Sequence, residues 1–409
     1  MPINLKQIPP LVPQPDLPKW WVWLLLLLSG FLTGTAWAIL NNQGESAINA
    51  AEFWETALVF PALIWLILLT LRIVWYRGVQ ATAEGSNEVR ERIYQQEIRR
   101  GRRSLAVLGV SMRSALREPN DKDGQMQRKA LQEKTQALKT QASWQSDEGT
   151  RHSRLVRIDD ETPEQLLSRE LSNTLEEMSR VLASVPADMP LTLLVESNSR
   201  LSDNQTQTIW QRSWAATQIR QPVTYIEGRG LEVVDQWLDH NVNNPAMLLI
   251  VALQLAPEPV EGTAETVVSL LLRSHTQGAD GLTPLATLHR PERMHGMSNQ
   301  DFHYALERAF DWVPVHPEDV NEGWLVGVHV KWNQAIATGL MALSSPINTG
   351  QDLHNLDSSL GYPGPAAPWF AIACATEQMS NSAPQLIVSG EGLADRSLWV
   401  TLVTPATDL

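Results

Sequence analysis

Two uncharged, apolar runs near the N-terminus constrain this chain more than any other feature. Residues 20–44 contain no charged side chain, and their first 21 residues begin with Trp-Trp-Val-Trp and five leucines. A helix that rises about 1.5 Å per residue needs roughly 20 such residues to cross the bilayer. Residues 56–76 form a second apolar run, in which Pro61 and Arg72 lie near the ends, where a helix tolerates them. The sequence therefore predicts a transmembrane helical hairpin with helices at 20–40 and 56–76.

Aromatic side chains border both runs. Their rings combine an apolar body with a polar edge and prefer the membrane interface. The expected membrane-interface residues are Trp20, Trp23, Trp54, Trp75 and Tyr76. A cleavable signal peptide is the alternative for the first run, because Ala36 and Ala38 have the spacing of a cleavage site, but the long leader and the second run disfavour it.

Arginine is distributed unequally around the two runs. The loop at 41–55 carries glutamates and neither Lys nor Arg, whereas arginines cluster after the second run. The positive-inside rule then places both termini in the cytoplasm and the loop across the membrane. The expected topology-determining residues are Arg77, Arg99, Arg100, Arg102 and Arg103. A lipid-headgroup site at residues 99–103 is the less favoured interpretation of the same cluster.

The rest of the chain divides by composition. We expect a cytoplasmic leader at 1–19, a basic stalk or linker at 77–103 and a body at 104–409. The body carries 22 Lys and Arg against 37 Asp and Glu, so it repels phosphate backbones and disfavours nucleic-acid binding. The single cysteine, Cys374, excludes an intramolecular disulfide framework and fits a reducing compartment.

Strand-like and helix-like segments alternate through the body. Residues 247–255 are an unbroken apolar run typical of a buried strand, and Thr162 precedes a helix with one apolar stripe. This pattern predicts an α/β body with a mixed sheet, and its length favours two fused halves or two domains. Residues 118–160 interrupt the pattern with polar side chains and predict a long loop or an exposed helix.

Histidines and carboxylates come closest to a metal-site pattern between residues 289 and 303. The group comprises His289, Glu292, His295, Asp301 and His303. Its spacings do not place ligands on one helix face, so we expect scattered surface or loop histidines and no metal. His316 is followed by Pro317, Glu318 and Asp319, which is typical of a helix start.

Catalytic and cofactor motifs are also missing from the sequence. Ser389 precedes Gly390-Glu391-Gly392 but lacks the leading glycine of a nucleophile elbow. Neither a phosphate-binding loop nor a dinucleotide fingerprint occurs, and residues 227–230 indicate only a turn. Cys374 lies in an apolar helical segment and is expected to be an inert buried thiol. The sequence therefore predicts no cofactor and no enzymatic activity.

Short runs across the body resemble one protein family. They are Leu194-Val195-Glu196-Ser197, Tyr225-Ile226-Glu227-Gly228, Leu253-Gln254-Leu255-Ala256-Pro257, Gly262-Thr263-Ala264-Glu265, Leu288-His289-Arg290-Pro291-Glu292 and Gly364-Pro365-Ala366-Ala367-Pro368-Trp369. Together they resemble the type VI secretion lipase adapter family, from about residue 104 onward. The resemblance implies a thiolase-like, non-catalytic body in a bacterial cell. It also implies partners, a secreted lipase effector, the type VI spike protein or both, and hence an anchor in the inner membrane.

A second similarity supports the thiolase-like expectation. Residues 361–367 are similar to the Gly-His…Gly-Ala-Ala loop of ketosynthases, with Tyr362 in place of the histidine. The first half has no cysteine where a thiolase nucleophile would lie. The two apolar runs and residues 118–160 have no counterpart in the resembled family.

Two other functions remain open at this stage. A membrane-anchored acyl-group enzyme would need a pocket that joins His289 or His329 to a carboxylate. A structural component of the secretion envelope complex is also compatible with two membrane helices.

Overall fold

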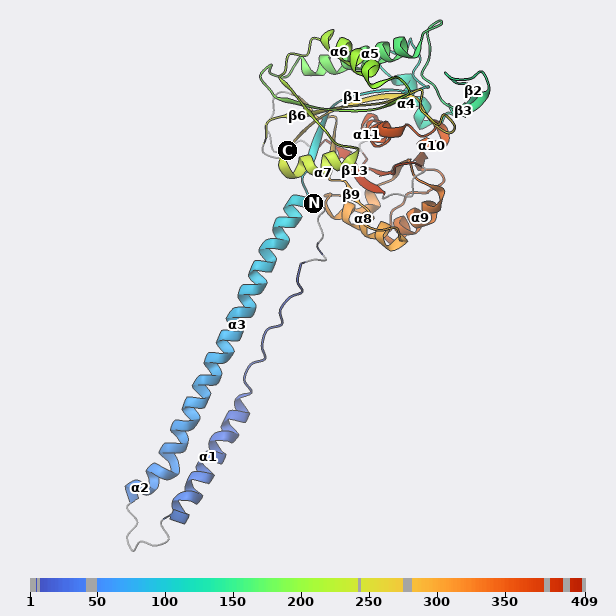
Figure 1. Ribbon diagram of the computed structural model, residues 1–409. Helices are drawn as coiled ribbons and strands as arrows, with labels where there is room; N and C mark the ends of the chain where they lie inside the picture. The colour runs from blue at the N-terminus through green and yellow to red at the C-terminus, as the bar shows by residue number, and fades with distance from the viewer. Residues whose placement is uncertain are drawn as a thin grey trace. The chain divides into compact units, whose positions relative to one another are not determined.

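The chain forms two compact units in the computed structural model, which Figure 1 shows as a ribbon. Among the described residues, one unit comprises those up to residue 97, and the other comprises those from residue 98 onward. The structure describes residues 5, 8–41, 50–241, 244–274, 282–378, 383–392 and 398–406.

The N-terminal unit is built from helices. They are α1 (Trp20–Asn41), α2 (Ala50–Trp54), a π-helix (Glu55–Val59) and α3 (Phe60–Gly101). Two helical segments, Trp20–Leu40 and Ala51–Gly101, are long and apolar enough to cross a membrane. Of the expected loop at 41–55, residues 42–49 lie outside the described residues and residues 50–54 are helical. The expected stalk is helical up to Gly101.

Small residues bring the two apolar helices into close contact. A Cβ atom on Gly34 would lie 2.7 Å from Cγ of Pro61 and 2.8 Å from the carbonyl oxygen of Ala57. Pro61 has no N–H to donate to Ala57, four residues earlier, and the π-helix lies at this position. The indole Nε1 of Trp65 also donates a hydrogen bond of 2.7 Å to the carbonyl oxygen of Trp23.

The proline-rich leader lies along α3 within the same unit. The backbone N–H and carbonyl of Val12 both bond to the side chain of Asn87, at 2.9 and 3.0 Å. Nε of Arg90 donates to the carbonyl oxygen of Pro9 at 2.7 Å. These three hydrogen bonds place the segment before α1 beside the segment that follows the second apolar run.

The body contains one extended mixed sheet. In its first half the strands are β1 (Ser104–Arg113), β4 (Leu191–Ser199), β5 (Val223–Ile226), β6 (Met247–Leu255) and β7 (Thr266–Ser274). In its second half they are β8 (Ala286–His289), β10 (Glu322–Val326), β11 (Leu353–Asn355), β12 (Gln385–Ser389) and β13 (Trp399–Pro405). The short β9 (Glu292–Arg293) pairs with β13.

The two halves have the same strand order. It is β5-β4-β6-β7-β1 in the first half and β11-β10-β12-β13-β8 in the second. The middle strand of each half, β6 or β12, runs parallel to the strand before it in this order and antiparallel to the strand after it. The first strands of the two halves, β1 and β8, pair antiparallel and join the sheet. The expectation of a body in two related halves is thus confirmed.

Helices follow the same repeat. They are α5 (Pro163–Leu182), α6 (Asp203–Ala215) and α7 (Leu231–His240) in the first half, and α8 (Asn299–Asp311), α9 (Asn333–Ala342) and α11 (Ala367–Glu377) in the second. Figure 1 shows α5 and α6 on one side of the body and α8 and α9 on the opposite side. Helix α11 packs against strands of both halves, and its buried residues share one hydrophobic core with those of α7.

Local signals explain where these helices begin. Thr162 caps α5 and forms a capping box with Gln165, and Ser202 and Ser298 cap α6 and α8 in the same way. Helices α7 and α11 have no side-chain cap from their N-cap residues, Gly230 and Ala366. Both of these uncapped helix starts belong to the central layer of the body.

The polar stretch at 118–160 is folded rather than a single loop. It contains α4 (Gln125–Gln132) and a hairpin of β2 (Lys139–Ala142) and β3 (Gly149–His152). Nε1 of Trp144 donates to Oε1 of the buried Glu265 at 2.5 Å and connects the loop of the hairpin to the residue before β7. A short helix, α10 (Leu356–Ser359), provides the carbonyl of Ser359 to Ala137 and Leu138.

Candidate functional site

A cavity of about 740 Å³ lies where the two halves meet. We call it the central cavity. Its walls come from the end of β4, the start of α7, the loop before α11 and the end of β12. The side chains and backbone that line it are those of Val195, Glu196, Ser197, Asn198, Gly228, Arg229, Gly230, Leu231, Glu232, Arg293, Tyr362, Gly364, Pro365, Pro368, Ser389, Gly390, Glu391 and Trp399.

Glu196 holds the two uncapped helices together. Its Oε1 accepts a hydrogen bond of 3.0 Å from the backbone N–H of Gly230, at the start of α7. Its Oε2 accepts one of 2.6 Å from Nε1 of Trp369, in the first turn of α11. Burial raises the pKa of Glu196, while these two donors oppose the rise. A helix start attracts negative charge, so the chain's own carboxylate occupies this position.

An amide network fixes the loop before α11. Nδ2 of Asn198 donates to Oε1 of Gln254 at 2.9 Å, and Nε2 of Gln254 donates to the carbonyls of Ala264 and Tyr362 at 2.9 and 2.8 Å. Gly364 has a φ of +59°, and a Cβ atom there would come within 1.9 Å of the Gln254 side chain. Only glycine fits this position.

Tyr362 occupies a narrow slot beside the cavity. Cβ atoms on Gly327 and Gly392 would each lie within 3 Å of its ring. Burial raises the pKa of the Tyr362 hydroxyl, and the nearby Asp357 raises it further. Oδ2 of Asp357 accepts from the backbone N–H of Gly327 at 2.7 Å, and burial raises the pKa of this carboxyl to about 7. The tyrosine is therefore a neutral, tightly packed group at neutral pH.

The groups that could act as nucleophile or base lie elsewhere. Among the described residues that line the central cavity there is neither a cysteine nor a histidine. Cys374 is buried in α11 with its Sγ 3.9 Å from Sδ of Met112, and burial raises the pKa of its thiol. A raised pKa keeps a thiol protonated and unreactive.

The histidines proposed as metal ligands or as catalytic groups lie on different elements. His289 is buried in β8, and its Nε2 lies 2.9 Å from Oγ1 of Thr404. His303 lies on α8, 3.1 Å from the carbonyl oxygen of Ala335. His329 caps a short 3-10 helix at residues 330–332. Within the part of the chain that the structure describes, no three His, Cys, Asp or Glu side chains are grouped as metal ligands would be.

The expected interface residues are placed on the two apolar helices. Trp20, Trp54 and Trp75 are 75%, 56% and 60% exposed in the protein alone, whereas Trp23 and Tyr76 are half-buried. The guanidinium of Arg72 lies 4.3 Å from the centre of the Trp75 ring.

The arginines expected to set the topology fall into two groups. Arg77, Arg99 and Arg102 are exposed. Arg100 instead pairs with Asp239, on the last turn of α7, and Arg103 donates to the carbonyl of Leu238 at 2.9 Å. Asp239 also receives Arg290, which is 1% exposed, and the two arginines lower the pKa of Asp239 against the effect of its burial. Arg100 and Arg103 therefore have a structural role in the body.

Comparison with solved structures identifies the fold. Over 74% of this chain and all of the other, the body superimposes on the ishigamide ketosynthase/chain length factor with a TM-score of 0.53 and 12% identity. A second similar structure is AntDE:AntF, a type II PKS acyl-carrier protein in complex with its ketosynthase. The superposition covers 75% of this chain and all of a chain of that complex, with a TM-score of 0.51 and 12% identity. No protein-family model and no curated protein sequence matches the chain.

These similarities show that the body has a thiolase-like fold, as expected from the sequence. Three of the six runs that suggested it, at residues 194–197, 225–228 and 364–369, contain residues that line the central cavity or the pocket beside it. Sequence reasoning missed the roles of Glu196 and Gln254 and the cavity positions of Arg229, Glu232 and Arg293. Their partners are distant in the chain, so no local motif indicates them.

Proposed function

We propose that this protein is a membrane-anchored adapter that uses its thiolase-like body to bind another protein without catalysis. The observation that carries this proposal is the carboxylate of Glu196 at the starts of α7 and α11. A reacting carbonyl or thiolate would need the N–H groups of such a helix start for its own negative charge. At α7 the N–H of Gly230 is already taken by Glu196, which reaches α11 through the indole of Trp369, and this favours a scaffold over an acyl-transfer site.

The finer proposal is an adapter of a bacterial type VI secretion system. Its partners would be a secreted lipase effector, the spike protein or both, as implied by the resemblance of six sequence runs to the type VI secretion lipase adapter family. Residues 104–409 are strongly acidic, which favours a basic partner surface and binding that weakens with added salt.

The proposed location is the bacterial inner membrane, with both termini and the body in the cytoplasm. The hydrogen bonds of Val12 and Pro9 with Asn87 and Arg90 support a hairpin, since they require the leader and the stalk to be on the same side. The exposed Arg77, Arg99 and Arg102 favour the cytoplasmic side.

An acyl-group enzyme is the second candidate, because the two superimposed proteins are named as ketosynthases. The hydroxyls of Ser197 and Ser389 line the central cavity and would be the nucleophiles to consider. A structural role in the secretion envelope is the third.

One experiment separates the three functions. Full-length protein is purified from its native cell in mild detergent, washed at rising salt and examined by mass spectrometry. The adapter proposal expects a lipase effector or spike protein that is retained by the wild type and by Lys129→Glu, an exposed control on α4, but reduced with Arg229→Glu in the cavity.

Two results would contradict the adapter proposal. Recovery of envelope-complex subunits alone, equally with both variants, would favour the structural function. A mass increase on Ser197 or Ser389 after incubation with an acyl thioester would favour the enzyme.

A further inference from the structure

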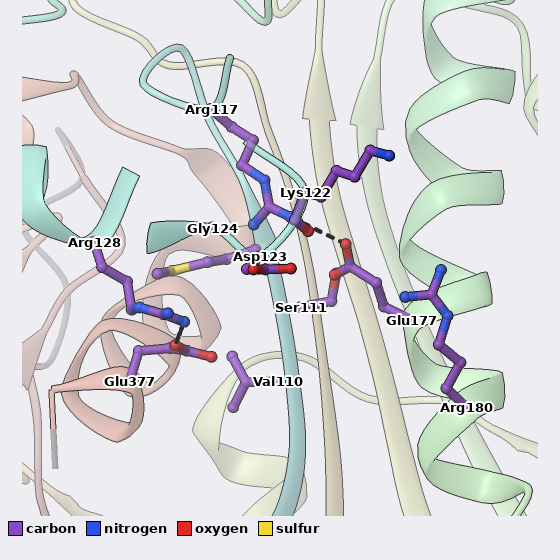
Figure 2. A pocket seen from close by; sticks show the side chains of 11 residues that line it. Val110, Ser111, Arg117, Lys122, Asp123, Gly124, Arg128, Glu177, Arg180 and Glu377 are labelled. Carbon is purple, nitrogen blue, oxygen red and sulfur yellow. Dashed lines mark hydrogen bonds and ion pairs between the residues drawn. The ribbon is translucent and has the colours of Figure 1, made fainter. Parts of the chain in front are cut away.

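A second pocket lies at the other end of α11, away from the central cavity. It has a volume of about 220 Å³ and is lined by Val110, Ser111, Met112, Arg117, Lys122, Asp123, Gly124, Arg128, Glu177, Arg180 and Glu377. We call it the basic pocket. It joins the end of β1, the loop before α4, helix α5 and the last residue of α11, as Figure 2 shows.

The basic pocket gathers cations in an acidic body. Arg117, Lys122, Arg128 and Arg180 come from three separate elements, against the carboxylates of Asp123, Glu177 and Glu377. Residues 104–409 as a whole have 15 more acidic than basic side chains. The cations of the pocket can attract an anion, whereas the acidic surface around them repels a large polyanion. A small anion is therefore favoured.

Much of the donor capacity of these cations is not used within the protein. Arg117 uses Nη2, which donates to the carbonyl of Lys122 at 2.7 Å and to Glu177 at 3.1 Å, while its buried Nε has no hydrogen-bond partner. Arg128 bonds to Glu377 through Nη1, and Arg180 bonds to Glu176 through Nη2 at 2.7 Å. Lys122 is exposed and has no ion pair among the described residues.

The wall of the pocket is also polar at its β1 side. Oγ of Ser111 donates to Glu177 at 2.5 Å, so this carboxylate is held by Ser111 as well as by Arg117. The pocket therefore has a hydrogen-bonded polar lining suited to a polar ligand.

Burial makes Arg117 the centre of the basic pocket. It is 9% exposed, and burial lowers the pKa of its guanidinium although Glu177 opposes this effect. A desolvated cation of this kind gains more from an added anion than an exposed one does. Gly124 allows the close approach, since a Cβ atom there would lie 2.3 Å from Nη1 of Arg117.

We propose that the basic pocket binds a phosphoryl group of a small molecule. Guanidinium groups match phosphate oxygens in pairs, and Arg117 and Arg128 both line the pocket, with Lys122 as a third cation in its lining. One ordered water needs roughly 10–15 Å³ of such space, so the pocket admits a group several times larger. This site is independent of the proposed adapter function.

Calorimetric titration of the full-length protein in detergent with sodium pyrophosphate tests the proposal, against sodium chloride of equal ionic strength. Saturable binding to the wild type is expected. Lys122→Gln should weaken it by at least about tenfold, as should Arg128→Gln, because each removes a charge-assisted hydrogen bond. The control is Lys129→Gln, an exposed cation that pairs with Glu133 on the same helix as Arg128.

A loss of binding in Lys122→Gln can be distinguished from a loss of folding. Lys122 is exposed and unpaired, so its replacement leaves the fold unchanged, which the melting temperature verifies. Absence of saturable pyrophosphate binding to the wild type would overturn the proposal, as would equal weakening by Lys129→Gln.

The same titration in nanodiscs identifies the source of the phosphoryl group. Nanodiscs of phosphatidylcholine alone should leave pyrophosphate binding intact. If the addition of phosphatidic acid abolishes that binding, the headgroup of an anionic lipid is the ligand. If phosphatidic acid has no effect, the ligand is a soluble phosphorylated molecule.

Discussion

The side chains of Glu196 and Trp369, 173 positions apart, meet in a hydrogen bond of 2.6 Å that joins the two halves of the body. Glu196 follows the buried part of β4, and Trp369 lies in the first turn of α11. The same carboxylate receives the backbone N–H of Gly230. One side chain therefore fixes both helix starts of the central layer.

Replacement of Glu196 should destabilise the body. Glu196→Ala leaves the indole of Trp369 and the N–H of Gly230 without acceptors, at a cost of about 1–3 kcal/mol each. Glu196→Gln keeps a carbonyl acceptor and should cost less. Thermal unfolding of the purified protein measures the difference, with Glu232→Ala, an exposed residue of the same cavity, as control. Equal melting temperatures for Glu196→Ala and the wild type would contradict this account.

The stability of the body should fall as pH rises from 5 to 8, because burial raises the pKa of Glu265 to about 7 from a usual 4.5. The fold favours the neutral form of the Glu265 carboxyl. The stabilisation that this form gives is complete below pH 4.5, the pKa in the unfolded chain, and is lost as the pH rises through about 7, the pKa in the folded protein. The difference is up to roughly 3 kcal/mol for this group. Glu265→Gln should reduce the pH dependence.

Two further carboxyls share this pH range. Burial also raises the pKa of Glu292 and of Asp357 to about 7, so Glu265→Gln removes only part of the effect. The exposed Glu258→Gln is the matched control. If the melting temperatures of the wild type and of Glu265→Gln change equally between pH 5 and pH 8, the prediction that Glu265 contributes to the pH dependence is wrong.

Glycines of α3 should respond in opposite directions to alanine. A Cβ atom on Gly101 would lie 2.4 Å from the ring of the buried Trp312, so Gly101→Ala should destabilise by about 1–3 kcal/mol through overpacking. Gly85 has open space around it on the same helix, and Gly85→Ala should stabilise by up to about 1 kcal/mol. Urea unfolding of both variants measures this. Similar effects of the two changes would show that the contact with Trp312 is unimportant.

The topology can be tested with a membrane-impermeant thiol reagent in intact cells. Ser46→Cys, between the two apolar helices, should react from outside, and Ser86→Cys, on the stalk, should react only after lysis. Cys374 gives little background because it is buried. The reverse labelling pattern would refute the proposed orientation.

Cys374 should itself resist alkylation in the native protein. Burial raises the pKa of its thiol, so iodoacetamide should modify it only after denaturation. Cys374→Ala should retain partner binding. Rapid modification of the native thiol would return Cys374 to consideration as a reactive group.

Local sequence signals predict elements better than contacts. The strand expected at 247–255 is β6, and the helix expected after Thr162 is α5, since the apolar run, the capping box and the apolar stripe are local. Strand β10, in contrast, ends at Val326, where Gly327 adopts a φ of +64°. Nothing local predicts this left-handed turn, which a contact with the distant Gly390 requires.

The candidate site shows the same limit. Residues 227–230 indicated only a turn, yet Gly230 starts α7 inside the central cavity. Arg100 belonged to a cluster explained by membrane topology, and its partner Asp239 lies 139 residues away. Pairs of residues this far apart in the sequence come together only in the complete fold. No local pattern in the sequence indicates them.

The order of elements determines where mechanical load enters the body. Helix α3 ends at Gly101 and β1 begins at Ser104, so the helix that carries the second apolar run leads directly into a strand that is bonded on both sides, to β7 and to β8. A force applied through α3 would act on the middle of the sheet and not on a border strand such as β5 or β11. Two ladders of backbone hydrogen bonds would have to break together before β1 could leave the sheet.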